Sequence, residues 1–307
     1  MKRYFIINPV SGNGRAREFV AKLKEGDYGQ VYITAGKGDA ERFIKQEAES
    51  REKCVFYAVG GDGTLNETVN GAAGLKNVSI GVIPAGTGND FVRYFENRDK
   101  FLDIDAQLNG EEIQIDAIKA VFDGVKSVFF INMANIGFDC NVVINASKIK
   151  NGIISGPMAY IMGAVQEIFR KWGQDVKITF DDGYEYNGCQ LLCTIANAGY
   201  CGGGFNSSPF ADISDGYIDA AIIDKISRPK LISMLKGYRD GTYLNDPKAK
   251  DFITYRRAKS LTAEFGSNTE ISVDGEIFEF KRADFTVHKG CLNFIVPKGA
   301  YIPGGLK

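Results

Sequence analysis

Three short segments combine glycines with hydroxyl, amide and acidic side chains, a composition suited to binding a phosphate chain. They read Asn-Pro-Val-Ser-Gly at residues 8–12, Gly-Gly-Asp-Gly-Thr-Leu-Asn-Glu at residues 60–67 and Pro-Ala-Gly-Thr-Gly-Asn-Asp at residues 84–90. Glycines let the backbone approach a phosphate closely, and a helix that follows such a loop offers unpaired N–H groups at its positive end. A serine or threonine in each segment adds a hydroxyl donor. The three segments therefore predict a binding site for the phosphates of a nucleotide.

Two aspartates within these segments, Asp62 and Asp90, have the wrong charge to contact a phosphate directly. A carboxylate beside a phosphate loop is explained by a cation or an ordered water between the two groups. We therefore expect Mg²⁺ near the phosphates, with Asp62 and Asp90 orienting it or its water molecules.

The rest of the composition argues against several other chemistries. The 307 residues include one histidine, His288, and six cysteines with no Cys-x-x-Cys pair, which disfavours histidine-dependent triads and zinc sites. There is no Walker A sequence and no complete Gly-x-Gly-x-x-Gly, so P-loop NTPases and standard dinucleotide dehydrogenases are disfavoured. The net charge of −1 gives no support for nucleic-acid binding. Acid–base chemistry in this chain is therefore expected to use carboxylates.

The elements that must position the phosphate segments are strands of the first third of the chain. There, an apolar run is followed by a break and then by a helix-like run, four times in succession. This alternation is typical of a parallel sheet with helices on both faces, which binds ligands at the carboxyl ends of its strands. The predicted strands cover residues 4–7, 31–34, 55–59 and 78–83, and the predicted helices cover residues 15–23, 39–49 with Asp39 as N-cap, 65–70 and 90–96.

After about residue 103 the pattern changes to many short alternating runs, several of them joined by Asp-Gly pairs that favour hairpin turns. These runs predict a mostly antiparallel second domain, a sandwich or barrel, with helices near residues 156–171 and 229–237. We expect a first domain at residues 1–108 and a second at residues 109–296, with residues 297–307 able to pack back onto the first. The predicted strands of the second domain cover residues 113–117, 119–122, 127–132, 176–180, 189–196, 218–223, 261–265, 271–273, 277–280, 285–289 and 292–296.

Taken together, the three segments and several later motifs resemble the diacylglycerol kinase catalytic-domain family, with the greatest similarity to its soluble bacterial lipid kinases. The resemblance extends over nearly the whole chain and implies an N-terminal α/β domain like that of NAD kinase and phosphofructokinase, followed by a β-sandwich. The later motifs occur in the order that this family shows: Asn135-x-Gly137, Gly202-Gly203-Gly204, Pro209-x-Ala211, Asp215-Gly216 and Asp274-Gly275-Glu276.

The resemblance also implies roles for individual residues. The general base would be Glu276, with Asp274 beside it, and Asp62 and Asp90 would join an aspartate–water–magnesium network near the transferred phosphate. A structural Mg²⁺ would be held by Asp212, Asp215 and the backbone of Tyr217. The residues that would contact ATP are Asn8, Pro9, Val10, Ser11, Gly12, Thr34, Gly61, Asp62, Gly63, Thr64, Leu65, Asn66, Glu67 and Thr87.

Considered without the resemblance, the two acidic motifs of the second domain have simpler interpretations. The apolar alternation around Asp274-Gly275 predicts a hairpin turn with Glu276 exposed on a strand. Phosphoryl transfer to an alcohol nevertheless needs a carboxylate that accepts or orients the hydroxyl proton. Residues 212–217 equally fit a turn between strands without a metal. Both interpretations stay open at this point.

Two further segments bear on contact with a membrane. Residues 152–172 are apolar on more than one face, which fits either a buried helix or a lipid access path. A basic stretch fits either a solvated face or a patch that meets anionic lipids; it comprises Arg228, Lys230, Lys236, Arg239, Lys248, Lys250, Arg256, Arg257 and Lys259. We find no signal peptide or spanning segment and expect a cytoplasmic protein that contacts the inner face of the membrane transiently.

The sequence therefore predicts a Mg²⁺- and ATP-dependent kinase that phosphorylates a hydroxyl of a lipid such as diacylglycerol. One alternative is a NAD kinase, which shares Gly-Gly-Asp-Gly-Thr. Another is a nucleotide- or lipid-binding regulator that kept the fold and lost the chemistry. The identity of the lipid and the oligomeric state, including a homodimer, are left open by the sequence.

Overall fold

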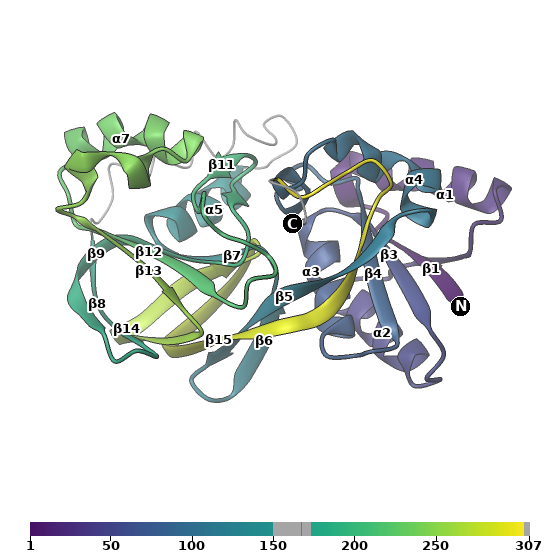
Figure 1. The fold of residues 1–307 in the computed structure, drawn as a ribbon, viewed down its shortest axis with the longest axis horizontal. Coiled ribbons are helices and arrows are strands. Elements are labelled where there is room, and N and C mark those ends of the chain that lie inside the picture. The colour runs from purple at the N-terminus through teal and green to yellow at the C-terminus, as the bar shows by residue number, and fades with distance from the viewer. Residues whose placement is uncertain (150–166, 168–172, 304–307) are drawn as a thin grey trace. The chain divides into compact units, whose positions relative to one another are not determined.

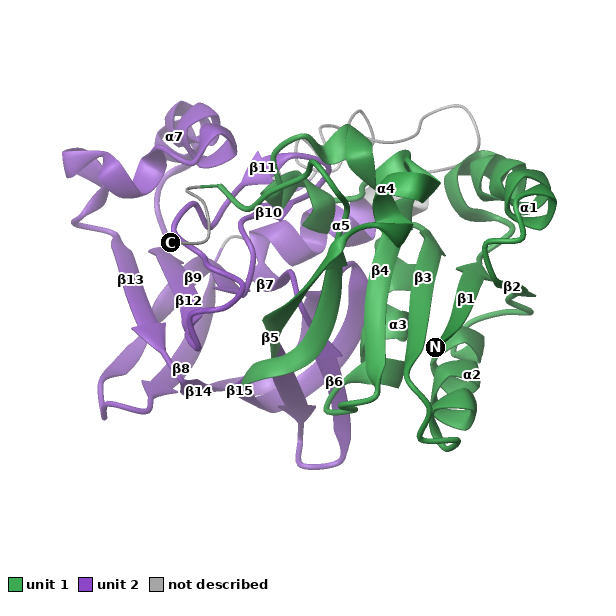
Figure 2. Cartoon of the chain, turned by 45° about the vertical axis from the view of Figure 1, so that its right-hand side comes forward, with its two compact units in different colours: residues 1–117, 289–307 green, residues 118–288 purple. Residues whose placement is uncertain are grey.

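The computed structural model describes residues 1–149, 167 and 173–303 of the chain. They form two compact units (Figure 2). Unit 1 comprises Met1–Ala117 and Lys289–Lys307, and unit 2 comprises Ile118–His288. The predicted apolar helix at residues 152–172 lies outside the described residues, apart from Glu167.

Unit 1 is built on four parallel strands (Figure 1): β1 (Lys2–Ile7), β2 (Gln30–Ile33), β3 (Cys54–Gly60) and β4 (Val78–Pro84). Their order is β4-β3-β1-β2, and the register pairs Ile7 with both Ile33 and Val59. All seven residues of β3 are buried. A strand that is covered on both faces must be apolar throughout, which is why residues 55–59 could be identified from the sequence.

Helices cover both faces of this part of the sheet. They are α1 (Arg15–Glu25), α2 (Asp39–Ala48), α3 (Asp62–Ala72) and α4 (Ile104–Leu108), with short 3₁₀ turns η1 (Ser11–Gly14), η2 (Phe91–Tyr94) and η3 (Arg98–Leu102). On one face, Leu23 of α1 packs with Tyr57 of β3 and with partly buried side chains of α4. On the other face, Phe43 of α2 contacts the stacked rings of Tyr4 and Phe56.

Two sequence predictions in unit 1 are wrong in detail. The N-cap of α2 is Gly38, and Asp39 is its first helical residue, with a carboxylate that accepts from the backbone N–H of Ala35 at 2.7 Å. The helix predicted at residues 90–96 is the single 3₁₀ turn η2, which ends where Phe95 adopts an extended conformation.

Unit 2 consists of long strands that pair antiparallel, as in β9–β12, β7–β9 and β14–β15. Its buried core lies among these strands and includes Phe130, Phe280 and Phe285. The strands are β5 (Glu111–Phe122), which begins in unit 1, β6 (Lys126–Phe130), β7 (Met133–Gly137), β8 (Gln174–Phe180), β9 (Glu185–Ala196), β12 (Ile218–Asp224), β13 (Ile253–Ala258), β14 (Ser260–Val273) and β15 (Glu276–Val296), which ends in unit 1.

The described helical elements of unit 2 are α5 (Phe138–Ile149), α7 (Arg228–Asp240) and the 3₁₀ turns η4 (Tyr243–Asn245) and η5 (Pro247–Ala249). A separate two-stranded ribbon is formed by β10 (Tyr200–Cys201) and β11 (Phe205–Asn206). Among the described residues, no helix combines the length and the apolar character that crossing a bilayer requires.

The expected division into a parallel sheet and a separate sandwich is only part of the observed topology. Thirteen of the described strands belong to one hydrogen-bonded sheet whose pairings are mostly antiparallel, and the parallel strands form one end of it. The connection is β15, which pairs antiparallel with β14 and then parallel with β4 at Asn293 and Phe294. The three strands predicted at residues 277–280, 285–289 and 292–296 are therefore one strand, because its polar residues and Gly290 do not interrupt it.

Candidate functional site

The three phosphate segments predicted from the sequence meet at the carboxyl ends of β1, β3 and β4. The backbone N–H groups of Ala85 and Gly86 both donate to the carbonyl of Gly60, at 2.8 and 3.1 Å. A Cβ atom on Gly86 would overlap the Cα of Gly61, and one on Gly12 would overlap the carbonyl oxygen of Ala85. Gly12 also has a φ of +59°, which disfavours any larger residue. These glycines are thus required for the loops to contact one another.

Asp62 joins the second segment to the third. Its Oδ2 accepts from the backbone N–H of Asn89 at 2.9 Å, and its Oδ1 accepts from that of Asp90 at 2.8 Å. Burial raises the pKa of Asp62, and these two N–H groups oppose that rise. Both oxygens therefore shape the loop at residues 86–90, a role that the residue type did not reveal and that leaves each oxygen a second lone pair for the predicted magnesium network.

Asp90 is buried and forms an ion pair with Arg93, whose Nε lies 3.3 Å from Oδ1. The Nη2 of Arg93 donates to the carbonyl of Gly88 at 3.2 Å, so one arginine fixes both the carboxylate and the loop that precedes it. The positive charge of Arg93 also lies close to the site expected to hold phosphates.

Thr64, in the second segment, has a buried side-chain hydroxyl. The residue is 5% exposed, and its Oγ1 is a buried atom without a hydrogen-bond partner among the residues that the structure describes. A buried hydroxyl with no partner costs stability, so a partner from a bound molecule would be favourable there. Thr87, from the third segment, is exposed to solvent.

Other predicted nucleotide contacts are engaged within the protein. The Oγ1 of Thr34 donates to the carbonyl of Ile7 at 3.3 Å. Leu65 and Asn66 are buried on α3, whereas Val10 is 73% exposed. The predicted ATP contacts in residues 8–12 and 61–67 and at Thr34 and Thr87 all lie in unit 1.

Glu67 holds the start of α2. Its Oε1 accepts from the backbone N–H of Gly38 at 2.7 Å, and its Oε2 accepts from that of Ala40 at 3.2 Å. The first N–H groups of a helix have no partner within the helix, and a carboxylate there is favoured by the helix dipole. Glu67 therefore caps a helix whose N-cap, Gly38, lies 29 residues earlier in the chain, a role that the sequence did not indicate.

The Asp-Gly-Glu motif of unit 2 forms the tight hairpin between β14 and β15 that the alternation predicted. Val273 pairs with Glu276, and Asp274 and Gly275 have φ values of +46° and +89°. The carboxylate of Asp274 accepts from the backbone N–H of Met133 at 3.0 Å and from that of Ile131 at 3.3 Å. Asp274 thus fixes the turn to the start of β7, while Glu276 is half-buried beside it.

The residues expected to hold a structural Mg²⁺ lie just before β12. Asp212 accepts from the N–H and the hydroxyl of Ser214, both at 2.9 Å, and Asp215 accepts from the N–H of Tyr217 at 2.9 Å and pairs with Arg257. Within the described ranges, no group of three or more histidine, cysteine or acidic side chains has the arrangement of a metal site.

A third acidic residue, Asp219 on β12, extends this cluster and was missed in the sequence. It is fully buried; its Oδ1 accepts from the hydroxyl of Tyr255, and its Oδ2 has no hydrogen-bond partner within the described part of the chain. Burial raises its pKa to about 6, with smaller upward contributions from Asp215 and Asp212. Carboxylate oxygens such as Asp219 Oδ2 are the type of ligand that a hard cation prefers. In this structure the guanidinium of Arg257 pairs with Asp215.

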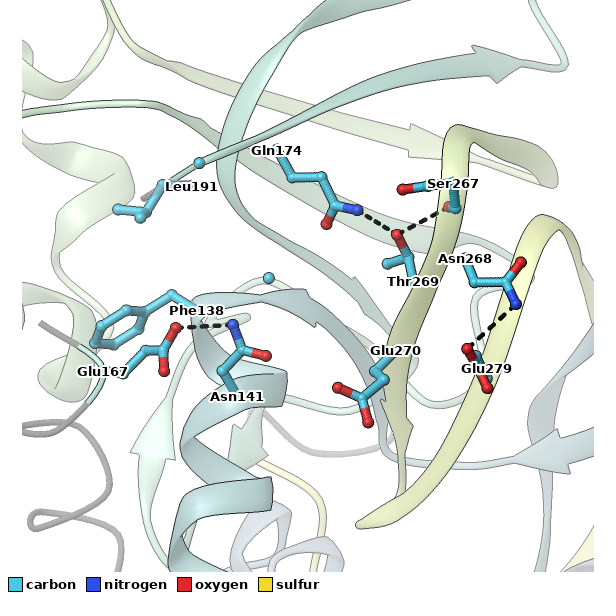
Figure 3. A pocket seen from close by; sticks show the side chains of 12 residues that line it. Phe138, Asn141, Glu167, Gln174, Leu191, Ser267, Asn268, Thr269, Glu270 and Glu279 are labelled. Carbon is cyan, nitrogen blue, oxygen red and sulfur yellow. Dashed lines mark hydrogen bonds between the residues drawn. The ribbon is translucent and has the colours of Figure 1, made fainter. Parts of the chain in front are cut away.

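Unit 2 also contains a polar pocket of about 350 Å³ that no sequence motif indicated (Figure 3). Glu167 accepts from the amide of Asn141 at 2.8 Å at one side, and the amide of Gln174 donates to Thr269 at the other. Glu270 and Glu279, which are opposite one another on β14 and β15, complete an acidic wall. Such a lining suits hydroxyl groups better than acyl chains.

Comparisons with known proteins cover both units. Residues 2–120 match the family described as the diacylglycerol kinase catalytic domain, and residues 132–296 match the YegS C-terminal NAD kinase beta sandwich-like domain. A diacylglycerol kinase of Staphylococcus epidermidis is 30% identical over 96% of this chain and 92% of its own length, and one of Bacillus subtilis is 29% identical over 97% of each. The crystal structure of a diacylglycerol kinase from Bacillus anthracis superposes with a TM-score of 0.67 at 22% identity, covering 99% of this chain and 98% of that one.

Proposed function

Because the chain belongs to the diacylglycerol kinase family of lipid kinases, we propose that it transfers the γ-phosphate of ATP directly to the hydroxyl of a lipid alcohol such as diacylglycerol. The observation that carries the donor half of this proposal is the meeting of the three glycine-rich loops at one strand edge. Asp62 joins the second loop to the third through Asn89 and Asp90. Gly12 of the first loop lies against the Ala85 carbonyl of the third. The acceptor half rests on the similarity to relatives that are named diacylglycerol kinases.

The triphosphate would lie against the loops of unit 1. The unpartnered hydroxyl of Thr64 and the exposed hydroxyl of Thr87 are the donors that support this placement. The first turn of α3 adds backbone N–H groups, since Gly61 at its N-cap has no side chain to satisfy them. Asp62 and Glu67 act as positioning residues, because their oxygens already hold the loop and α2.

On the acceptor side, Glu276 would take the proton of the lipid hydroxyl as that oxygen attacks the γ-phosphorus and ADP leaves. Asp274 would keep the hairpin that carries Glu276 in place through its bonds to Ile131 and Met133. The polar pocket lined by Asn141, Glu270 and Glu279 offers hydrogen-bonding groups for the hydroxyls of a headgroup.

Mg²⁺ would be held in unit 2 by Asp212, Asp215, Asp219 and the backbone of Tyr217. When bound, Mg²⁺ stabilises negative charge and orients nearby groups, and the triphosphate would bring a further ion. Asp219 contributes the one buried carboxylate oxygen of this cluster that has no partner.

The direct test is incubation with labelled ATP and a total lipid extract, followed by identification of the labelled product. Glu276→Gln should abolish lipid phosphorylation and leave ATP binding nearly unchanged. Glu264→Gln, on the neighbouring strand β14 and paired with Arg282 at the surface, is the matched control and should retain activity. Normal turnover by Glu276→Gln would show that the base is another group.

A second candidate is NAD phosphorylation, favoured by the match of residues 132–296 to a NAD kinase-like sandwich. Release of ADP that depends on NAD and does not respond to lipid would establish it in place of the lipid reaction. ATP binding without transfer to any alcohol would instead support a non-catalytic regulator.

We also propose that the protein works in the cytoplasm and meets the inner face of the membrane transiently, because a diacylglycerol acceptor resides in a bilayer. Separation of vesicle-bound from free protein, with and without the acceptor, tests this directly.

A further inference from the structure

Helix α7 exposes an apolar side chain within a row of cations. Arg228, Ile232, Lys236 and Arg239 recur at spacings of four, four and three residues, which places them along one flank of the helix. Ile232 is 55% exposed, and the three basic residues are exposed as well. The other side of α7 is fixed to unit 2, where Leu231 and Tyr238 are buried.

The surroundings of α7 are strongly basic, although the chain as a whole is slightly acidic. Residues 225–251 contain seven exposed basic and three acidic side chains, a net charge of +4 against −1 for the whole protein. A shallow groove at the N-terminal end of α7 is lined by Lys225, Ser227 and Arg228, among others. Ser227, the N-cap, does not use its side chain to cap the helix, so the positive end of the helix dipole adds to these charges.

An anionic bilayer surface is the partner that matches both features. Cations attract the surface of an anionic membrane, and an exposed aliphatic side chain among them can enter the boundary between headgroups and acyl chains. Lysine and arginine can extend their charged ends to headgroups while their stems contact apolar groups. On a face that contacts only water, the charged side chains would favour solubility, but an exposed isoleucine at position 232 would add no stability.

The inner side of α7 connects it to the strand that leads to Glu276. The hydroxyl of Tyr238 donates to Asp139 of α5 and lies 3.4 Å from Thr194 Oγ1, which donates to Asn135 at 3.2 Å. Asn135 of β7 in turn pairs with Ser272 of β14, two residues before Asp274. Within unit 2, a helix held at a bilayer would therefore be fixed with respect to the acceptor hairpin.

We propose that α7 is the membrane-docking element of this protein, with Ile232 inserted below the headgroups and Arg228, Lys236 and Arg239 contacting anionic phospholipid. The proposal rests on the proposed function in one respect: if the acceptor is a membrane lipid, the protein must bind the membrane to reach it.

The test is co-sedimentation of the full-length protein with vesicles of phosphatidylcholine, with and without phosphatidylglycerol. Each basic residue near such a surface contributes about fivefold in affinity, so Lys236→Gln with Arg239→Gln should weaken binding to anionic vesicles about 25-fold. Ile232→Ser should weaken it by about three- to tenfold, because only part of an isoleucine side chain is inserted. Added salt should reduce the loss of vesicle affinity caused by the charge variants, because it screens electrostatic attraction, and should not change the loss caused by Ile232→Ser.

Lys76→Gln with Lys281→Gln is the matched control, since it removes two exposed basic residues far in sequence from α7. This control should bind anionic vesicles within twofold of the parent. The proposal is overturned if the α7 variants sediment like the parent, or if the control loses as much affinity as they do. Circular dichroism of every variant separates weakened docking from loss of folding.

A catalytic readout distinguishes docking from the proposed function. On a short-chain diacylglycerol that is monomeric in water, the α7 variants should keep the parent kcat and KM, whereas KM for acceptor in anionic vesicles should rise with the loss of affinity. If no lipid is phosphorylated by the parent, the kinase proposal fails, and the sedimentation result still decides whether α7 docks. A fall in kcat on the water-soluble acceptor would show that α7 acts on the site itself and would contradict docking.

Discussion

The Oδ1 of Asp62 accepts a hydrogen bond from the backbone N–H of Asp90 at 2.8 Å, which joins the second glycine-rich loop to the third. The neighbouring N–H of Asn89 donates to Oδ2, and a side chain at Gly88 would collide with that same oxygen. The aspartate of Gly-Gly-Asp-Gly-Thr thus fixes the loop at residues 86–90 before any nucleotide is present.

Removing this carboxylate should loosen the third loop. Asp62→Ala leaves two N–H groups unpaired, and each hydrogen bond to a charged group contributes about 1.5–3 kcal/mol, so we expect a loss of about 3–6 kcal/mol in stability. ATP affinity should fall at the same time. Chemical unfolding and calorimetric ATP titration measure the two effects, with the exposed Asp99→Asn as control; unchanged ATP binding in Asp62→Ala would rule out this positioning role.

Glu67 should act through α2 rather than through the nucleotide. Glu67→Ala removes the acceptor of the Gly38 and Ala40 N–H groups, and loss of such a cap costs about 1 kcal/mol. Amide hydrogen exchange at residues 38–40 should accelerate several-fold even without ATP. Glu49→Ala, an exposed glutamate just after α2, should leave this exchange unchanged. If exchange is normal and only ATP binding is lost, Glu67 contacts the nucleotide directly.

The acidic cluster before β12 predicts a stabilisation that depends on Mg²⁺ and not on ATP. Binding of an ion to the folded state alone raises stability by about 2.7 kcal/mol when the ion is at one hundred times its dissociation constant. Thermal unfolding of the parent in Mg²⁺ and in EDTA should therefore differ by several degrees, and Asp215→Asn or Asp219→Asn should remove most of the difference. If Mg²⁺ raises the unfolding temperature of the variants as much as that of the parent, the ion binds elsewhere.

Asp139 predicts a pH dependence of folding stability. Burial raises its pKa to about 6 from an ordinary value of 3.8, and the hydrogen bond from Tyr238 opposes part of that rise. The folded state therefore holds this proton more tightly, so the contribution is fully present below pH 4 and is lost as the pH rises through 6. The loss amounts to about 3 kcal/mol between these limits.

Asp139→Asn keeps an oxygen that accepts from Tyr238 and cannot ionise. Its stability relative to the parent should therefore increase between pH 4 and pH 7, as measured by urea unfolding at each pH. Asp181→Asn, at the exposed β8–β9 turn, should show no such trend. A parallel pH profile of Asp139→Asn and the parent would mean that Asp139 is not the titrating group.

The sequence alone identified the features that are local in the chain. Apolar runs such as residues 55–59 predicted buried strands, because a strand covered on both faces has to be apolar throughout. The glycine loops and the Asp274-Gly275 turn were recognised because a tight turn restricts residue type at its own positions. These local patterns were sufficient to predict the first four strands and their loops in the order in which they follow along the chain. They were also sufficient to place Glu276 directly after a hairpin turn.

Only the tertiary structure decided which partner each polar group takes. Asp62, Glu67 and Asp274 looked alike as candidate site residues, yet their oxygens are committed to N–H groups 27, 29 and 141 residues away. Asp219 was hidden in an apolar strand, and β15 appeared as three strands, since nothing local shows that it continues to pair with β4. A residue type fixes what a side chain can donate or accept, but the partner depends on chain segments that only folding brings together.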